Sequence, residues 1–267
     1  MSKTETTLRW LRILVLPGLV GMLSACVTTT TGGFNVEASE EQAIADYVQL
    51  AVGYFDAGDM PAARRNINAA LDLDRRNSDA HNILALIFQT EGDLDLAEDN
   101  FRRAISLDRN NSRARNNYAA LLFAADRYRE AYEQLQRVTQ DVNYEGRSIA
   151  FENLGRASLR IERREDAEAA FRRALQLNSN LYISALELAA IESDRQNWQL
   201  ARSFFQQYMT SVDFFNVPHT PRALLTGIRI EQQFGNTDLV QRFGLILNTL
   251  YQDSPEFQIY QRLSNAN

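Results

Sequence analysis

The sequence predicts an all-α protein, built as a right-handed superhelix of about six helix-turn-helix repeats with a C-terminal capping helix. Three observations support this prediction. Of the 267 residues, 45% are hydrophobic and 23% are charged, which is a folding composition. Only 12 glycines and five prolines occur, as expected of a chain that is mostly helical. A pattern of small and large apolar residues also recurs with a period near 34 residues.

The first 25 residues have the pattern of a secretory signal peptide. Lys3, Arg9 and Arg12 make the start positive, and an apolar run follows at residues 13–22. This run is too short to cross a bilayer as a helix. It is followed by the tetrad Leu-Ser-Ala-Cys, which contains the only cysteine of the chain. With one cysteine, the protein can form neither an internal disulfide nor a two-cysteine metal or redox motif.

The tetrad that ends at Cys26 resembles the bacterial lipobox. The resemblance implies that a dedicated peptidase cuts before Cys26 after its thiol has been diacylated, and that the new amino terminus is then acylated. The alternative is an ordinary signal peptide followed by a free cysteine. Val27 follows the cysteine, where an Asp would resemble an inner-membrane retention signal. The expected destination is therefore the periplasmic face of the outer membrane.

The net charge makes acyl chains the expected membrane anchor. The whole chain carries −6, and removal of residues 1–25 takes away Lys3, Arg9, Arg12 and Glu5 and leaves −8. Anionic lipid repels such a body, whereas two or more buried acyl chains hold it stably. The same acidic balance argues against binding nucleic acid, because no basic excess exists to neutralise phosphates. We expect a covalent lipid on Cys26 and no cofactor.

Residues 26–38 are expected to form a flexible tether. They contain four threonines and a Gly-Gly pair, and they show no hydrophobic periodicity. Ser39, with Gln42 three residues later, is a capping box, so the first helix is expected to begin there. From this point to residue 263 the sequence predicts a continuous repeat domain.

One pattern of apolar residues recurs through the repeat domain. It reads Ala-x3-(Ile/Phe)-x2-Ala-(Leu/Ile)-x-Leu-(Asp/Asn) and begins at Ala63, Ala97 and Ala167. The pattern resembles the tetratricopeptide repeat, a helix-turn-helix unit in which small residues let two helices approach and a large residue fills the gap to the next unit. The repeats are expected at residues 44–77, 78–111, 112–145, 148–181, 182–215 and 221–254.

The junctions between repeats carry further signals. Repeat 3 runs on through residues 140–146 before repeat 4, so either a longer second helix or a bulged loop is expected there. Thr220-Pro221 and Ser254-Pro255 each join an N-cap residue to a first-turn proline, which predicts helix starts at both points. The last of these helices, at 255–263, would cap the apolar face that the final repeat leaves open.

The residues of the repeat domain give no basis for catalysis or metal binding. Lys3 is the only lysine, so chemistry that needs a lysine in the folded part is excluded. No zinc-hydrolase, serine-hydrolase or phosphate-loop motif occurs. His81 is expected to pack between helices, and His219, in a loop between two prolines, is expected to be solvated. We therefore expect a binding protein and not an enzyme, with no catalytic residue and no metal site.

Solenoids of this kind bind partners on the concave face, which the first helices line. The candidate partner-binding groove is apolar in repeat 1 and more polar further on, which suits an extended or helical peptide. It consists of Val48, Val52, Phe55, Asn82, Leu86, Asn116, Phe123, Glu152 and Arg156. The amides of Asn82 and Asn116 are expected to hold the peptide backbone.

Two parts of this groove have a second interpretation. The apolar stripe of repeat 1 could be buried by the tether or by the curvature of the superhelix. Arg156 and its neighbour Arg160 could meet an acidic partner or be solvated charges on a helix surface.

Three phrases of the repeat domain, with the lipobox and the short tether, resemble the PilF/PilW family of type IV pilus biogenesis lipoproteins. They are Ala-His-Asn-Ile-Leu-Ala at 80–85, Arg-Ala-Arg-Asn-Asn-Tyr at 113–118 and Ala-Phe-Glu-Asn-Leu-Gly at 150–155. The resemblance extends from residue 26 to about residue 260. It implies a pilotin, an outer-membrane lipoprotein that engages the secretin subunit of the type IV pilus and promotes its localisation and multimerisation. Pilus biogenesis and twitching motility would depend on it.

The competing class is a periplasmic repeat scaffold for another envelope complex, such as β-barrel assembly or a peptidoglycan hydrolase. In either class we expect the body to be a monomer. A neighbouring secretin gene, or loss of twitching on deletion, separates the two classes.

Replacing Cys26 with serine tests the anchor. Cys26→Ser removes the thiol that would carry the diacylglycerol, so we expect unprocessed or mislocalised protein and fewer secretin rings in outer-membrane fractions. Membrane flotation and immunoblotting measure both quantities. If the variant still floats with the outer membrane at the wild-type level and rings are normal, the lipoprotein interpretation is wrong.

Overall fold

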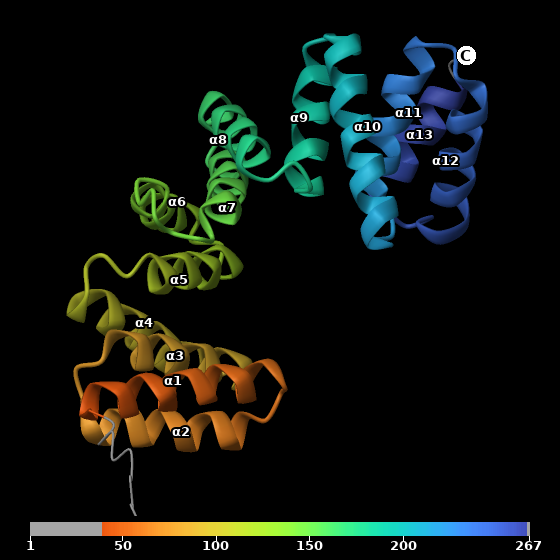
Figure 1. Ribbon diagram of the computed structural model, residues 1–267. Coiled ribbons are helices and arrows are strands. Elements are labelled where there is room, and N and C mark those ends of the chain that lie inside the picture. The colour runs from red at the N-terminus through yellow and green to blue at the C-terminus, as the bar shows by residue number, and fades with distance from the viewer. Residues whose placement is uncertain (1–38, 266–267) are drawn as a thin grey trace, which may run out of the picture. The chain divides into compact units, whose positions relative to one another are not determined.

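The computed structural model describes residues 39–265 (Figure 1). The predicted signal peptide, Cys26 and the tether lie outside the described residues. Within 39–265 all the regular elements are helices, which confirms the all-α repeat prediction. They are α1 (Glu40–Asp56), α2 (Met60–Leu73), α3 (Ser78–Glu91), α4 (Leu94–Leu107), α5 (Ser112–Ala124), α6 (Tyr128–Val138), α7 (Arg147–Arg160), α8 (Arg164–Leu177), α9 (Tyr182–Asp194), α10 (Trp198–Phe215), α11 (Pro221–Gln233), α12 (Thr237–Leu250) and α13 (Pro255–Asn265). No helix in this part of the chain has both the length and the apolar composition to cross a membrane.

The helices pack as consecutive hairpins followed by a cap. α1 packs against α2, α3 against α4, and so on to α11 against α12 (Figure 1). Each first helix also contacts the first helix of the next hairpin, from α1 with α3 to α9 with α11. α13 contacts α11 and α12 and covers the C-terminal end of the stack. Because every helix meets only near neighbours in the sequence, the first helices line up along one side of the stack.

Side-chain caps start several helices at the places the sequence predicts. The Oγ of Ser39 accepts a hydrogen bond from the backbone N–H of Gln42 (3.1 Å) at the start of α1. Thr220 and Ser254 accept backbone N–H groups in the same way at the starts of α11 and α13. α13 ends at Asn265, two residues beyond the predicted end of the capping helix.

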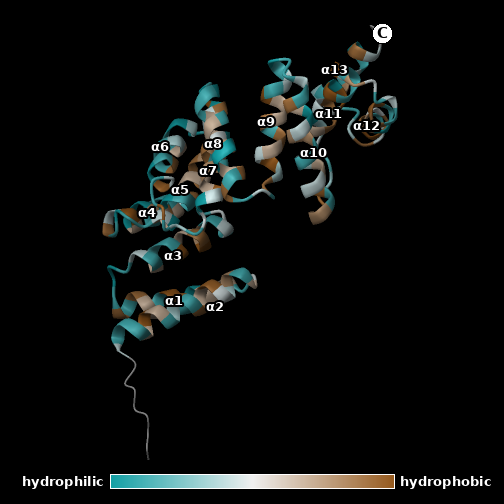
Figure 2. Ribbon diagram, turned by 45° about the horizontal axis from the view of Figure 1, so that its top comes forward, coloured by the Kyte–Doolittle hydropathy of each residue, from teal (hydrophilic) through white to brown (hydrophobic). Residues whose placement is uncertain are grey.

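The core is built on small residues where the two helices of a hairpin cross. Five successive first helices carry such a residue at the same place, and each is buried. These residues are Ala51, Ala85, Ala119, Gly155 and Ala189. At Gly155 an added Cβ would lie 2.6 Å from the ring of Phe171, so a larger residue would push α7 and α8 apart. Apolar and polar residues alternate along each helix, as a stack buried on one side of every helix requires (Figure 2).

Repeat 3 ends in a loop and not in a longer second helix. α6 has 11 residues and ends at Val138, and residues 139–146 lead to α7. Within this loop the carboxylate of Asp141 accepts hydrogen bonds from the Ser112 hydroxyl (2.6 Å) and the Asn143 backbone N–H (3.0 Å). These bonds fix the loop against the start of α5, so the bulged-loop alternative is the one the chain adopts.

The expectation that His219 is solvated is wrong. Its Nδ1 lies 3.0 Å from the hydroxyl of Tyr208, and its ring centroid lies 5.9 Å from that of Phe243. The Tyr251 hydroxyl donates to the His219 carbonyl (2.9 Å). The loop between the prolines therefore packs between α10 and α12, and this burial lowers the pKa of His219 and keeps the ring neutral.

A charge placed at a helix crossing tests this packing. Ala104 in α4 is fully buried, so Ala104→Glu should overfill the contact and bury a carboxylate, lowering the free energy of unfolding by about 3 kcal/mol or more. Because each repeat is stable only against its neighbours, the adjacent repeats should melt with it. Thermal unfolding followed by circular dichroism measures the change.

Ala169→Glu is the matched control, because Ala169 is an exposed alanine in α8. It should change stability by no more than about 0.5 kcal/mol. Equal midpoints for the two variants would contradict the packing described for α4.

Candidate partner-binding groove

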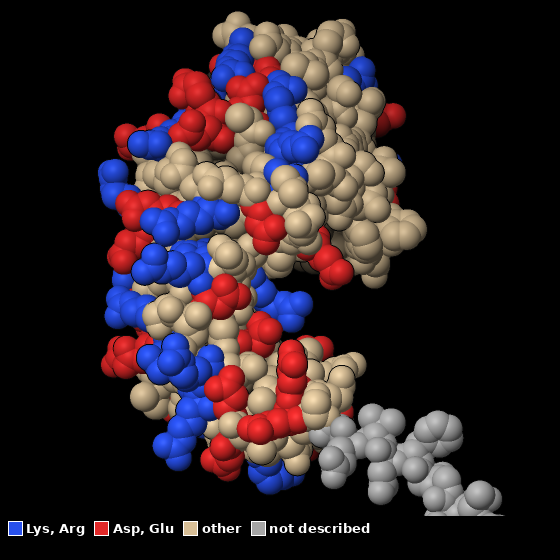
Figure 3. Space-filling view, turned by 60° about the vertical axis from the view of Figure 1, so that its left-hand side comes forward, with Lys and Arg blue, Asp and Glu red and all other residues tan. Residues whose placement is uncertain are grey.

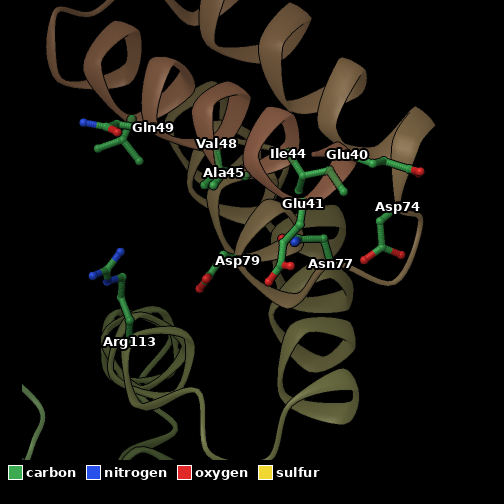
Figure 4. Close-up of a pocket in the computed structure, with 11 residues that line it drawn as sticks. Glu40, Glu41, Ile44, Ala45, Val48, Gln49, Asp74, Asn77, Asp79 and Arg113 are labelled. Carbon is green, nitrogen blue, oxygen red and sulfur yellow. The ribbon is translucent and has the colours of Figure 1, made fainter. Parts of the chain in front are cut away.

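An open cavity of about 760 Å³ lies between α1 and the N-terminal ends of α3 and α5 (Figure 4). Its floor is apolar and comes from α1, through Ile44, Ala45, Val48 and Val52. Its other lining residues are polar. They are Glu40, Glu41, Gln49, Asp74, Asn77, Asp79 and Arg113. We call this cavity the α1 groove.

The floor of the α1 groove follows from the spacing of its residues. Ile44, Val48 and Val52 recur every four residues and so lie on one face of α1. All three are half-buried and pack against a cluster that includes Ile83 and Ile87 of α3. The repeat 1 stripe is thus neither fully open nor fully buried: one side packs on α3, and the other side lines the groove. Phe55 packs on the same cluster but does not line the groove.

The rim of the α1 groove is acidic. Four carboxylates line it, from Glu40, Glu41, Asp74 and Asp79, against the single guanidinium of Arg113. In Figure 4 the side chains of Asp79 and Arg113 point into the space beneath α1. Glu40 and Glu41 lie in the first turn of α1, where a negative charge interacts favourably with the helix dipole. This interaction alone accounts for carboxylates at these two positions. Together the four charges give a negative field that favours basic side chains in a ligand.

Asn82 and Glu152 do not face the open groove, contrary to expectation. Asn82 is fully buried, and its Oδ1 accepts a hydrogen bond from Asn117 Nδ2 (3.0 Å). Glu152 is 7% exposed, and its Oε2 accepts from both the backbone N–H (3.0 Å) and the hydroxyl (2.8 Å) of Ser184. The stacking of first helices explains the difference, because each of these side chains bonds to the first helix of the next repeat.

Asn116 and Leu86 are also engaged between repeats, although each keeps a half-exposed surface. The Nδ2 of Asn153 lies 3.5 Å from Asn116 Oδ1, which links α5 to α7. Leu86 packs against the apolar clusters on both sides of α3. The amides predicted to hold a peptide backbone therefore serve first to join the repeats.

Phe123 and Arg156 meet in the middle of the stack. The guanidinium carbon of Arg156 lies 4.9 Å from the centroid of the Phe123 ring, and both residues line a smaller cavity of about 230 Å³ between α5, α6 and α7. Arg160 lies over the ring of Tyr128 in the same way, at 4.1 Å. Both arginines stack on aromatic faces, so neither is simply a solvated charge.

Between residues 39 and 265, no group of three His, Cys, Asp or Glu side chains comes together as a metal ion would require.

Comparisons with known proteins identify the repeats and the family. Two segments match tetratricopeptide repeat families, at residues 89–143 and 150–181. The type IV pilus assembly protein PilF of Pseudomonas aeruginosa is 34% identical over 240 residues, which cover 90% of this chain and 93% of that protein. The chain belongs to the PilF family of type IV pilus assembly proteins. The resemblance seen in the sequence is thereby confirmed.

Solved structures of PilF-family proteins share this stack of repeats. The structure of Pseudomonas aeruginosa PilF is 35% identical, with a TM-score of 0.77, and the match covers 84% of this chain and 99% of that one. The crystal structure of PilW, described as a widely conserved type IV pilus biogenesis factor, is 26% identical with a TM-score of 0.65. It covers 82% of this chain and 98% of that one.

Sequence reasoning misses part of the α1 groove of this PilF-family protein. Ile44 lies one turn before Val48, so the spacing of the stripe could have included it. Asp79 and Arg113 come from the two following repeats, and only the stacking of the helices brings them to α1. Both occupy the place of Ala45 in their own repeats, so the repeat period marks them as concave-face positions, although the candidate groove did not include them.

The pH dependence of stability tests the buried position of Glu152. Burial raises the pKa of Glu152, so the folded protein keeps this proton at pH values where the unfolded chain has lost it. The contribution of Glu152 to the free energy of unfolding therefore falls as the pH rises above 4.5, the usual pKa of a glutamate carboxyl. Glu152→Gln keeps an acceptor for Ser184 without the charge. Urea unfolding from pH 4 to pH 7 should show the variant gaining stability relative to the wild type as pH increases.

Glu133→Gln is the control, because Glu133 is exposed on α6. Its stability should follow the wild type across the same pH range. A Glu152→Gln curve that also runs parallel to the wild type would contradict the burial of an ionisable carboxyl there.

Proposed function

We propose that this protein is an outer-membrane lipoprotein pilotin, which binds the type IV pilus secretin and promotes its localisation and multimerisation. Membership of the PilF family supports a place in pilus biogenesis. The lipobox supports anchoring through acyl chains on Cys26, at the periplasmic face of the membrane. The tetratricopeptide architecture supports a role in binding and not in catalysis.

The α1 groove is the observation that carries this proposal. Val48 and Val52 expose apolar surface there, although most apolar residues of the stack are packed against the next repeat. The groove also lies on the helix that directly follows the tether, where a partner bound for the membrane would be met. The secretin segment that fits it has apolar residues for the floor and basic residues for the rim.

The strength of such binding can be bounded. Burying a valine- or isoleucine-sized side chain contributes about 1.5–3 kcal/mol before ordering costs. Ile44, Val48 and Val52 are already half-buried, so covering their remaining surface contributes about half of this for each side chain. Micromolar binding, which requires about 8 kcal/mol, therefore also needs contacts to the rim of the groove.

Paired substitutions in α1 test the proposal. Val48→Asp with Val52→Asp places charges on the apolar floor, so pull-down of the secretin should be lost. Since both valines also pack on α3, Val48→Thr with Val52→Thr keeps the side-chain shape and should weaken capture at least tenfold while circular dichroism stays helical.

Arg156→Glu with Arg160→Glu is the comparison, because these residues lie in the middle of the stack and away from the α1 groove. It should affect capture less than the α1 variants do. Normal capture by both folded α1 variants would refute the groove assignment. Failure of the wild-type protein to capture secretin would refute the pilotin role and leave the scaffold for another envelope complex.

A further inference from the structure

A second cavity, of about 690 Å³, lies at the junction of repeats 2 and 3 and is separate from the α1 groove. It is formed by the connection between α4 and α5, the first turn of α5 and the end of α6. Its lining residues are Arg109, Asn110, Ser112, Arg115, Arg137, Gln140 and Asp141. Three guanidinium groups and one carboxylate therefore face this cavity.

Arg115 is a buried charge whose contacts are all neutral. Its side chain is part of a residue that is only 6% exposed. Nε and Nη2 donate to the carbonyl of Arg109 (3.1 and 2.9 Å), and Nη1 donates to Gln134 Oε1 (2.8 Å). Three of the five guanidinium N–H groups are thus bonded, and none bonds to a carboxylate. A buried charge without an opposite charge is costly, so an anion near Arg115 would be favoured.

The surroundings of Arg115 add to its positive charge. Within residues 39–265, Arg109, Arg115 and Arg137 form no ion pair with a carboxylate. Burial and the neighbouring Arg137 lower the pKa of Arg115, and Asp108 offsets this only in part. Asp141, the carboxylate that lines the cavity, already accepts from Ser112 and the backbone.

The equivalent place in repeat 2 makes the same contact as Arg115 without a guanidinium. His81 lies 34 residues earlier, at the same place in the repeat, and packs as predicted from the sequence. Its ring hydrogen-bonds to the carbonyl of Arg75 (3.2 Å) and to Asn100 Oδ1 (2.9 Å), as Arg115 does to Arg109 and Gln134. An imidazole therefore suffices for this contact, so the further N–H groups that the guanidinium of repeat 3 carries are not needed to make it.

We propose that this cavity between repeats 2 and 3 binds a phosphate group through Arg109, Arg115 and Arg137. The guanidinium fork matches the oxygens of phosphate in pairs. Three guanidiniums line the cavity with one carboxylate, and Asp108 beside Arg115 offsets this excess only in part, so an anion with more than one negative charge is favoured. On the face shown in Figure 3, the arginines lie among carboxylates, so charge is balanced over much of the surface.

Calorimetric titration with inorganic phosphate at low ionic strength tests this site. The protein used is residues 39–267, because the repeats, their caps and their core all lie within this unit. We expect saturable binding to the wild type, at least tenfold weaker binding to Arg137→Gln, and the same loss for Arg109→Gln. Arg115→His keeps the kind of contact that His81 makes in repeat 2, so it should remain folded and also bind at least tenfold more weakly.

Arg103→Gln is the matched control, because Arg103 occupies the place of Arg137 in the preceding repeat, outside the cavity, and is exposed. It should bind phosphate like the wild type. Equal binding by all variants, or no binding by the wild type, would overturn the proposal. Phosphate binding is measured without secretin, so this test can refute the phosphate site without refuting the pilotin role, and the reverse also holds.

Vesicles separate the two sources of a phosphate group. Cosedimentation with phosphatidylglycerol vesicles that is lost in Arg137→Gln but kept in Arg103→Gln would identify a lipid headgroup. Binding of inorganic phosphate without such cosedimentation would identify a soluble phosphate compound. The absence of both kinds of binding would refute the site.

Discussion

The first five hairpins of this protein depend on the close approach of their two helices at a pair of small residues. The first helices carry an alanine or glycine at the crossing, and the second helices carry an alanine. The second-helix residues are Ala63, Ala97, Ala131, Ala167 and Ala201, and all are fully buried. This approach lets a larger side chain, such as Phe101 or Phe171, reach the following repeat. The narrow crossings therefore let apolar contacts extend from one repeat to the next.

The same packing determines how the first helices use their concave side. Asn82 bonds to Asn117, Asn116 approaches Asn153, and Glu152 bonds to Ser184. In the middle repeats, these polar side chains of the first helices therefore contact the next first helix. Within residues 39–265, no side-chain hydrogen bond joins α1 to α3. Apolar packing makes that junction, and the same apolar stripe of α1 also lines the α1 groove.

The periodicity of the sequence was enough to predict the fold, because spacing along the chain determines which face of a helix a residue occupies. The caps at Ser39, Thr220 and Ser254 were predictable for the same reason, since capping involves residues only three apart. The position of Glu152 was not, because its partner Ser184 lies 32 residues away and depends on the stacking of the repeats. His219 was misjudged because a loop between prolines carries no signal of what packs over it.

The candidate sites also differ in whether they depend on one helix or on the stacking of several repeats. The stripe of Val48 and Val52 follows from spacing within one helix, and the sequence predicts it. The acidic rim and the arginine cavity combine residues from different repeats, so they emerge only when the superhelix brings those residues together. His81 and Arg115 occupy equivalent places in repeats 2 and 3, and comparing them separates the contact that both make from the guanidinium that only repeat 3 has.

The two ends of the stack differ. α13 closes the C-terminal end, whereas in the described part of the chain no helix covers the outer face of α1. Tyr47, Leu50 and Tyr54 lie on that face and are 36%, 51% and 41% exposed. A repeat with a neighbour on one side only opens at a lower free energy than an interior repeat, so amide hydrogen exchange in α1 proceeds through local openings while the rest stays folded. A ligand that binds only the closed form of α1 raises that opening free energy by mass action, so order in this helix and occupancy of its groove are thermodynamically linked.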